Sequence, residues 1–143
     1  MAYAYSQTLE GGLAIIAKRR KSASEVESMA IIGEVRGKNV LLVDDLTETA
    51  GTLTKGAELL KKKGAKRIVA CVSHAILNNT GVERLRKSVI DELVTTDTVL
   101  RPAIRGVKIT TLSVAGLLGE AIKRIHNNSS VTSLFESKGG RTS

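Results

Sequence analysis

Short runs of aliphatic and β-branched residues alternate along the chain with stretches whose apolar residues recur at helical spacing. Strands are predicted over Gly12–Ile16, Met29–Val35, Asn39–Val43, Arg67–Ser73, Leu93–Thr96 and Val107–Val114. Helices are predicted over Gly51–Lys63, Thr80–Arg86 and Ala115–Ile125. This alternation predicts an α/β fold with a mostly parallel sheet and helices on both faces, in Rossmann-type layering.

Two of these segments carry more specific expectations. The run Asn39–Val43 is continuously apolar and ends at Asp44 and Asp45, which predicts a central parallel strand buried on both faces. The last helix is predicted to turn one apolar face inward, made of Leu117, Leu118, Ala121, Ile122 and Ile125. The tail from Ser137 to Ser143 is small and polar, so we expect a domain over residues 1–136 and a disordered segment over 137–143.

Composition narrows the class of protein and of partner. A chain of 143 residues with 42% hydrophobic residues is long enough for one core, and it lacks the apolar run of a membrane helix and the pattern of a secretory signal. We therefore expect a soluble cytoplasmic protein that neither enters membranes nor, with two Tyr, one Phe and no Trp, stacks the bases of nucleic acid. The net charge of +8 then favours phosphorylated metabolites as ligands. The single cysteine, Cys71, is expected to be a buried, reduced thiol.

The segment with the clearest chemistry follows the strand predicted over Asn39–Val43. Asp44 and Asp45 can accept hydrogen bonds from sugar hydroxyls or help to hold a divalent cation. The loop Thr49-Ala50-Gly51-Thr52 offers small side chains, backbone N–H groups, two hydroxyls and the start of a helix, which together suit a phosphate. An anion cradle beside two carboxylates predicts a site for a pentose 5-phosphate, and neither a Walker A loop nor a dinucleotide fingerprint occurs in the chain.

The segment Val40–Thr52 resembles the ribose-phosphate loop of the type I phosphoribosyltransferase fold. Further segments narrow the resemblance to the ribose-phosphate pyrophosphokinase (phosphoribosyl pyrophosphate synthetase) family: Leu13–Arg20, Gly64–Arg67, Val82–Leu85, Asp91–Asp97, Leu112–Ala115 and Ser129–Phe135. The resemblance extends from Tyr3 to Phe135 and is to the carboxyl-terminal half of these two-domain enzymes. Glu48 stands where the family commonly has Asp, and Ala17 where it often has an acid.

The resemblance implies transfer of the diphosphoryl group of Mg-ATP to the C1 hydroxyl of ribose 5-phosphate, which gives phosphoribosyl pyrophosphate and AMP. It implies that the 5-phosphate is bound by the loop residues Thr49, Ala50, Gly51 and Thr52. It implies that Asp44 and Asp45 bind the ribose hydroxyls and contact Mg²⁺ through the ligand. It also implies that Lys18 and Arg20 are catalytic cations. The half of the family's enzymes that binds adenine has no counterpart in this sequence. We therefore expect the chain to bind ribose 5-phosphate or phosphoribosyl pyrophosphate, and to turn over poorly alone.

Two other functions stay open at this point. The chain could be a non-catalytic regulatory or assembly module that joins full-length synthetase subunits, or a short phosphoribosyltransferase, although no segment is left over for a base-binding hood. We also expect a homo-oligomer or an association with synthetase subunits. Neither His74 nor His126 is assigned to catalysis. For His74 two alternatives stay open: a role as a base or metal ligand, and simple packing beside the site, which the sequence favours at least as strongly.

Overall fold

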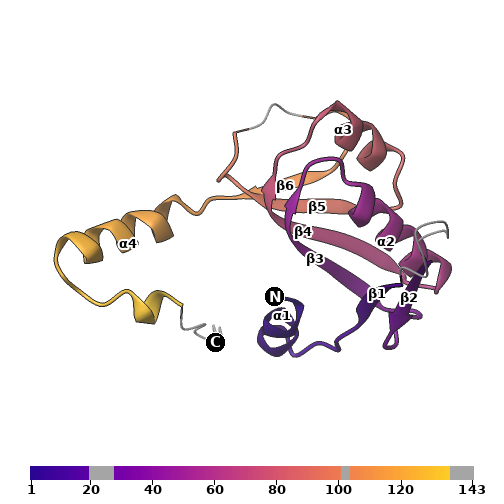
Figure 1. Ribbon diagram of the computed structural model, residues 1–143, viewed down its shortest axis with the longest axis horizontal. Helices are drawn as coiled ribbons and strands as arrows, with labels where there is room; N and C mark the ends of the chain where they lie inside the picture. Colours follow the sequence, from indigo (N-terminus) through magenta and orange to yellow (C-terminus); the bar gives the residue numbers. More distant parts are fainter. Residues whose placement is uncertain (20–27, 101–103, 136–143) are drawn as a thin grey trace.

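The computed structural model describes residues 1–19, 28–100 and 104–135 (Figure 1). The helices are α1 Ala2–Thr8, α2 Gly51–Lys62, α3 Asn79–Arg86 and α4 Ala115–His126, with a short 3₁₀ helix at Thr132–Leu134. The strands are β1 Ile15–Arg19, β2 Ser28–Ile32, β3 Asn39–Thr47, β4 Arg67–Ala75, β5 Glu92–Thr96 and β6 Ile109–Leu112. Within the described residues, the order of predicted strands and helices is confirmed. Helix α1 and the 3₁₀ helix are not among the predicted elements, and β1 is shifted three residues toward the carboxyl end from the strand predicted over Gly12–Ile16.

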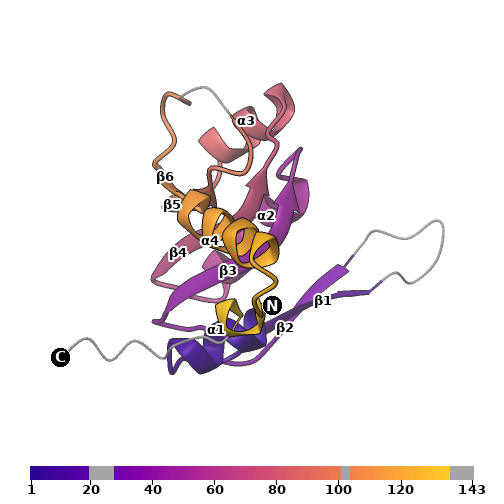
Figure 2. The same ribbon diagram turned by 90° about the vertical axis from the view of Figure 1, so that its left-hand side faces the viewer.

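The centre of the molecule is a four-stranded sheet in the order β3-β4-β5-β6, with every neighbouring pair parallel. The α/β class with a parallel sheet flanked by helices is therefore confirmed. Parallel strands bring their carboxyl ends to one edge of the sheet, and ligands of open α/β sheets bind at that edge. In this chain it is the edge from which β3 leads into α2 (Figures 1 and 2).

Helices α2 and α3 pack on the same face of this sheet. Leu53 of α2 and Leu85 of α3 share a buried cluster with Val72 and Leu93, while Leu60 of α2 packs in a second cluster with other apolar residues. The helical spacing of Leu53, Ala57 and Leu60 explains why α2 buries this side. The helix ends as the sequence predicts, with two lysines in its last turn, followed by Lys63 and then by Gly64 at φ +88°.

Strand β3 differs from its predicted position. It is the edge strand of the four-stranded sheet rather than a central strand, and it continues past Val43 to Thr47. Residues from Val40 to Asp44 are half-buried, because α2 covers one side of the strand while a cavity of about 290 Å³ lies between the strand and α1 on another. A continuous apolar run specifies burial, but it does not specify the number of neighbouring strands.

Strands β1 and β2 form a separate antiparallel ribbon in which Ile15 pairs with Ile32. The sequence predicts strands here but not their pairing with each other. The ribbon is anchored on α2, where Ile16 Cδ1 comes so close to Gly56 that a Cβ at that glycine would lie 3.0 Å from it. Gly56 therefore allows the ribbon and the helix to approach one another.

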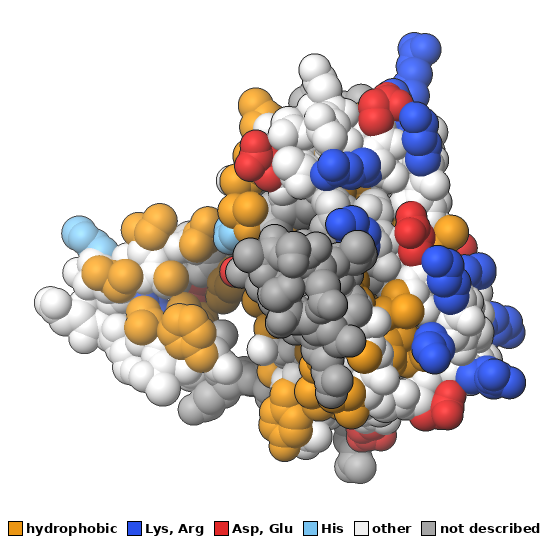
Figure 3. Space-filling model, turned by 45° about the vertical axis from the view of Figure 1, so that its right-hand side comes forward, with side chains coloured by type: hydrophobic (Ala, Val, Ile, Leu, Met, Phe, Trp, Pro, Cys, Tyr) orange, Lys and Arg blue, Asp and Glu red, His pale blue; other side chains and the backbone are white. Residues whose placement is uncertain are grey.

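Helix α4 lies away from the sheet, and the prediction of a buried inner face is wrong (Figure 1). None of its residues is buried, and Leu117, Leu118, Ile122 and Ile125 are 53%, 54%, 68% and 66% exposed. Helical periodicity specifies an apolar stripe but not the surface that covers it, and within the described residues this stripe has no cover. Figure 3 shows hydrophobic side chains gathered on the part of the molecule that projects from the sheet.

Cys71 is a free thiol on β4, and it is half-buried rather than fully buried. Burial, with a smaller effect of the Glu92 carboxylate, raises the pKa of this thiol. The raised pKa favours the protonated thiol over the nucleophilic thiolate. Across the described ranges, no helix is both long and apolar enough to cross a membrane.

Candidate functional site

The candidate phosphate-binding loop joins the carboxyl end of β3 to the start of α2. Ala50 immediately precedes α2 with φ 52° and ψ 14°, a left-handed conformation that non-glycine residues rarely adopt, and it is 2% exposed. No side chain caps the first turn of the helix from Ala50. The N-terminal N–H groups of a helix have no partner inside the helix and carry its positive dipole end, so an anion can bind there. Thr49 and Thr52 are both exposed beside this helix start.

The two acidic residues lie within β3, three and two residues before its end. Asp44 Oδ1 accepts a hydrogen bond from the backbone N–H of Asp45 at 3.0 Å, and Asp45 Oδ1 accepts one from the N–H of Leu46 at 2.8 Å. These local bonds fix each carboxylate relative to the strand. Asp44 is half-buried and Asp45 is exposed, so Asp45 is the more accessible acceptor for a ligand hydroxyl.

Arg84 of α3 contacts the loop, and sequence reasoning missed it. Its Nη1 donates to the carbonyl oxygen of Thr49 at 3.0 Å, and the same atom would lie 2.9 Å from a Cβ on Gly51. A guanidinium group therefore lies directly against the backbone that would hold a phosphate. The helical pattern indicates only that Leu85 faces the core while Arg84 is exposed, and no signal in the sequence shows that Arg84 reaches the loop.

A second set of contacts from α3 holds Glu48, the first residue of the loop. The backbone N–H of Asn78 donates to the Glu48 carbonyl at 3.2 Å, and Asn78 Nδ2 donates to Glu48 Oε1 at 3.3 Å. Asn78 also caps α3, because its Oδ1 accepts from the N–H of Gly81 at 2.9 Å. Gly81 packs so closely that a Cβ there would lie 2.2 Å from the Glu48 carbonyl oxygen. Asn78 and α3 thus hold the loop at Glu48 and Thr49 and pack closely against Gly51.

The predicted catalytic cations cannot be compared with this geometry. Lys18 belongs to β1, where its backbone is in register with Met29, but its side chain lies outside the described part of the structure. Arg20 and the predicted tail over 137–143 lie outside the described residues altogether. The roles of Lys18 and Arg20 therefore stay predictions. Elsewhere, Figure 3 shows Lys and Arg side chains spread over the right-hand side of the molecule in that view.

The acidic pair offers only part of a metal site. Carboxylate oxygens are ligands that Mg²⁺ prefers, and Asp44 and Asp45 supply them. Among the residues that the structure describes, however, no group of three or more His, Cys, Asp or Glu side chains could hold a metal ion. A magnesium ion bound to these two carboxylates would complete its coordination with water or with oxygen atoms of the ligand.

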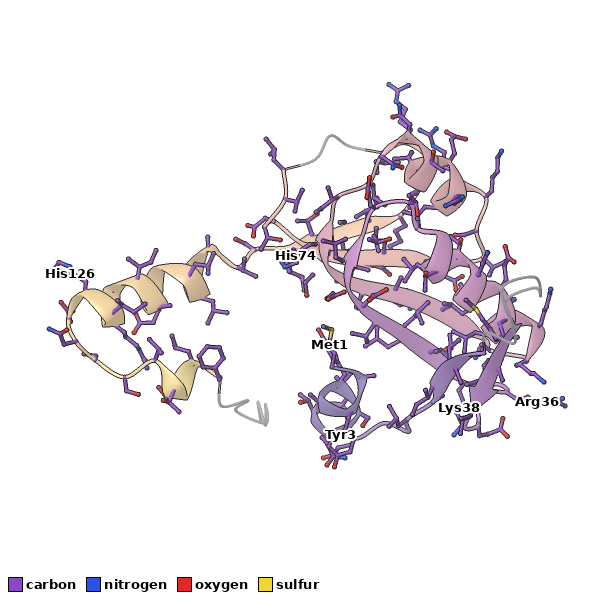
Figure 4. The ribbon with its side chains drawn as sticks, in the orientation of Figure 1. Met1, Tyr3, Arg36, Lys38, His74 and His126 are labelled. Carbon is purple, nitrogen blue, oxygen red and sulfur yellow. The ribbon has the colours of Figure 1, made fainter. Side chains whose placement is uncertain are left out.

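His74 lies at the same edge of the sheet, at the end of β4 (Figure 4). In the parallel register His74 is paired with Leu46 of β3. Leu46 directly follows Asp45 and lies two residues before Glu48, where the loop begins. His126 ends α4, as the sequence predicts, and is far from this edge (Figure 4).

Comparisons with known proteins agree on one family. The family model of the phosphoribosyl synthetase-associated domain matches residues 3–136. A ribose-phosphate pyrophosphokinase of Campylobacter jejuni is 48% identical over 124 residues, which are 86% of this chain and 40% of that protein. One from Caldanaerobacter subterraneus is 48% identical over 132 residues, 92% of this chain and 42% of the relative.

A solved structure shows the same fold. The phosphoribosylpyrophosphate synthetase from Mycobacterium smegmatis superposes with a TM-score of 0.78 at 30% identity, over 88% of this chain and 41% of that one. The chain thus spans about two fifths of the length of the proteins that it matches.

Proposed function

Because the chain belongs to the phosphoribosyl synthetase-associated domain family, we propose that it is the ribose 5-phosphate-binding part of a ribose-phosphate pyrophosphokinase. The observation that supports this most directly is the loop Thr49–Thr52, which lies between a strand bearing two carboxylates and a helix start without a side-chain cap. In the whole enzyme, the diphosphoryl group of ATP is transferred to the C1 hydroxyl of ribose 5-phosphate, giving phosphoribosyl pyrophosphate and AMP.

In this proposal the two halves of the ligand are recognised by opposite chemistry. The 5-phosphate accepts hydrogen bonds from the backbone N–H groups and hydroxyls of the loop, and the nearby guanidinium of Arg84 strengthens the local positive potential. The carboxylates of Asp44 and Asp45 accept hydrogen bonds from the ribose hydroxyls and repel the phosphate. This difference orients the sugar with its phosphate toward α2.

Transfer of a diphosphoryl group needs cations that stabilise developing charge, together with exact positioning of the two substrates. We propose that Lys18 and Arg20 supply such cations, and that Mg²⁺ enters with the phosphate ligands. We assign no described residue to the adenine of ATP. The proposal therefore predicts that this chain binds ribose 5-phosphate well and catalyses slowly by itself, because the positioning of ATP is lost.

Calorimetry with two ligands tests the proposal. Ribose 5-phosphate and inorganic phosphate are titrated separately into the wild type and into Asp45→Asn and Thr52→Ala variants. Asparagine keeps an acceptor oxygen for the Leu46 N–H and removes the charge, so Asp45→Asn should weaken ribose 5-phosphate about tenfold and leave inorganic phosphate unchanged or tighter. Thr52→Ala should weaken both ligands.

Glu58→Gln provides the matched control, because Glu58 is exposed on α2 and also loses one negative charge. Its affinities for both ligands should equal those of the wild type. Wild-type affinity for ribose 5-phosphate in both the Asp45→Asn and the Thr52→Ala variants would refute the assigned site.

A second candidate function is supported by the exposed apolar stripe of α4. A surface of this kind on a protein that spans about two fifths of its relatives suits an assembly module that joins synthetase subunits. Co-purification with a full-length synthetase, in the absence of any binding of ribose 5-phosphate or phosphate, would favour this function over the first.

A further inference from the structure

The imidazole of His74 is held by a chain of hydroxyl groups at the carboxyl edge of the sheet. Its Nδ1 lies 2.7 Å from Thr98 Oγ1, which in turn lies 2.8 Å from Thr96 Oγ1. The Thr96 hydroxyl donates to the carbonyl oxygen of Ser73 at 2.7 Å. The chain therefore connects the histidine ring to a backbone carbonyl, which can only accept hydrogen bonds.

The direction of the protons along this chain is determined. The Thr96 proton goes to the Ser73 carbonyl, because two oxygen atoms 2.7 Å apart need a proton between them and a carbonyl carries none. The hydroxyls of Thr98 and Thr95 lie farther from the same carbonyl, at 3.3 and 3.5 Å. Thr96 Oγ1 must then accept from Thr98, which uses the single proton of the Thr98 hydroxyl. Thr98 Oγ1 has no proton left for the ring, so His74 Nδ1 is the donor in their contact. In the neutral imidazole Nε2 is consequently unprotonated and is an acceptor.

The position of the ring indicates what that acceptor meets. His74 is exposed and lies beside Leu46 in the β3–β4 register, one row after Asp45 and one row before Thr47, where β3 ends. Neighbouring strands are about 5 Å apart, and in this register His74 shares a face of the sheet with Leu46 and Asp44, so we expect the ring to reach a ligand that lies between Asp44 and the loop. Figure 4 shows His74 at this end of the sheet.

We infer that Nε2 of His74 accepts a hydrogen bond from a ring hydroxyl of the bound pentose phosphate, an inference that rests on the proposed function. An acceptor nitrogen matches a hydroxyl donor and does not match an ionised phosphate oxygen, which can only accept hydrogen bonds. A metal ion is a poorer match, because the described residues place no group of three ligating side chains around His74. His74 is thus a binding residue specific for the sugar half of the ligand.

Isotope-edited NMR and calorimetry on the full 143-residue chain test the inference. Two-bond ¹H–¹⁵N spectra report which ring nitrogen of His74 carries the proton, and ribose 5-phosphate should perturb the Nε2 resonance whereas inorganic phosphate should not. The His74→Asn variant keeps a side-chain N–H near the position of Nδ1 and removes the acceptor at Nε2. It should bind ribose 5-phosphate about fivefold more weakly and inorganic phosphate as the wild type does.

Two further variants separate binding from structure. Thr98→Val interrupts the hydroxyl chain, so the NMR spectrum should lose the single Nδ1–H tautomer and the affinity for the sugar phosphate should fall with it. His126→Asn, at the end of α4, should change neither ligand's affinity.

Unchanged ribose 5-phosphate affinity in His74→Asn, or an Nε2–H tautomer in the wild type, would overturn the inference while leaving the proposed function standing. Failure of the wild type to bind ribose 5-phosphate would overturn both. An equal loss of both ligands in His74→Asn would also overturn the inference, since it would indicate a structural role.

Discussion

Replacement of Gly81 by alanine tests how tightly α3 holds the phosphate loop. A Cβ at this position would lie 2.2 Å from the carbonyl oxygen of Glu48 and 3.2 Å from its carbonyl carbon. Real Cβ atoms are essentially never found within 3.0 Å of another heavy atom, and the obstacle here is backbone rather than the end of a flexible side chain. Either α3 or the loop must therefore move by about 1 Å.

The expected magnitude follows from opposing effects. Alanine in a helix interior is favoured over glycine by about 0.5–1 kcal/mol. Overpacking of this kind costs about 1–3 kcal/mol, and separating α3 from Glu48 weakens the Asn78–Glu48 bonds, each contributing about 0.5–1.5 kcal/mol. The net result should be a loss of about 1–3 kcal/mol in the free energy of unfolding. Because the loop moves with Glu48, inorganic phosphate should also bind about tenfold more weakly.

Urea unfolding followed by circular dichroism measures the first effect, and calorimetry with inorganic phosphate the second. Gly119→Ala is the matched control, because Gly119 is also helical and its added Cβ meets nothing within 4 Å. That variant should be as stable as the wild type or slightly more stable, with unchanged affinity. If Gly81→Ala behaved like Gly119→Ala in both measurements, the close contact between α3 and the loop would not exist in solution.

Three other changes have definite expected outcomes. Arg84→Ala should lower the affinity for inorganic phosphate several-fold by calorimetry, and Arg84→Lys should recover part of that loss. The difference in affinity from the wild type should become smaller in high salt. Equal affinities of Arg84→Ala and the wild type at low salt would contradict a role for the guanidinium at Thr49. The Asp97 carboxylate accepts hydrogen bonds from the Ser113 hydroxyl and the Val114 N–H, which lower its pKa. The ionised Asp97 carboxylate should contribute fully to stability above pH 3.8, and this contribution should disappear as the pH falls through the lower pKa of the folded state. Asp97→Asn should therefore make the melting temperature less dependent on pH on the acid side. An unchanged dependence of melting temperature on pH would contradict this expectation. Ile122→Glu should reduce self-association in analytical ultracentrifugation without lowering the melting temperature, because Ile122 is 68% exposed; a large loss of stability would mean that α4 packs on its own sheet.

The sequence predicted the strands and helices well, because the spacing of apolar residues and the conformational preferences of single residues act over short stretches of chain. The spacing of Leu53, Ala57 and Leu60 corresponds to one buried face of α2, and Gly64 ends that helix for conformational reasons that the sequence makes visible. The loop over Thr49–Thr52 was predicted at the start of α2, and its left-handed residue is Ala50 rather than a glycine. A non-glycine residue in this conformation gives no signal in the sequence.

The remaining features depend on contacts between distant segments. The edge position of β3 follows from its pairing with β4 alone, and an apolar run gives no information on this choice. The contact of Arg84 with Thr49 joins residues 35 positions apart, and the His74 chain joins β4 to the last residue of β5, Thr96, and to Thr98 beyond it. Periodicity cannot predict such contacts, because it reports the face of an element and not the neighbour of that face.

The junction between β6 and α4 has a consequence for amide hydrogen exchange. Only Ser113 and Val114 separate the two elements, and the Val114 N–H is held by Asp97 at 2.9 Å, while α4 itself contributes no buried residue. Amides of β4, which is flanked by β3 and β5, should exchange only when the whole domain unfolds. Amides of α4 should exchange by local fraying at a rate insensitive to denaturant, so a single protein would show two separate classes of protection, divided at Val114.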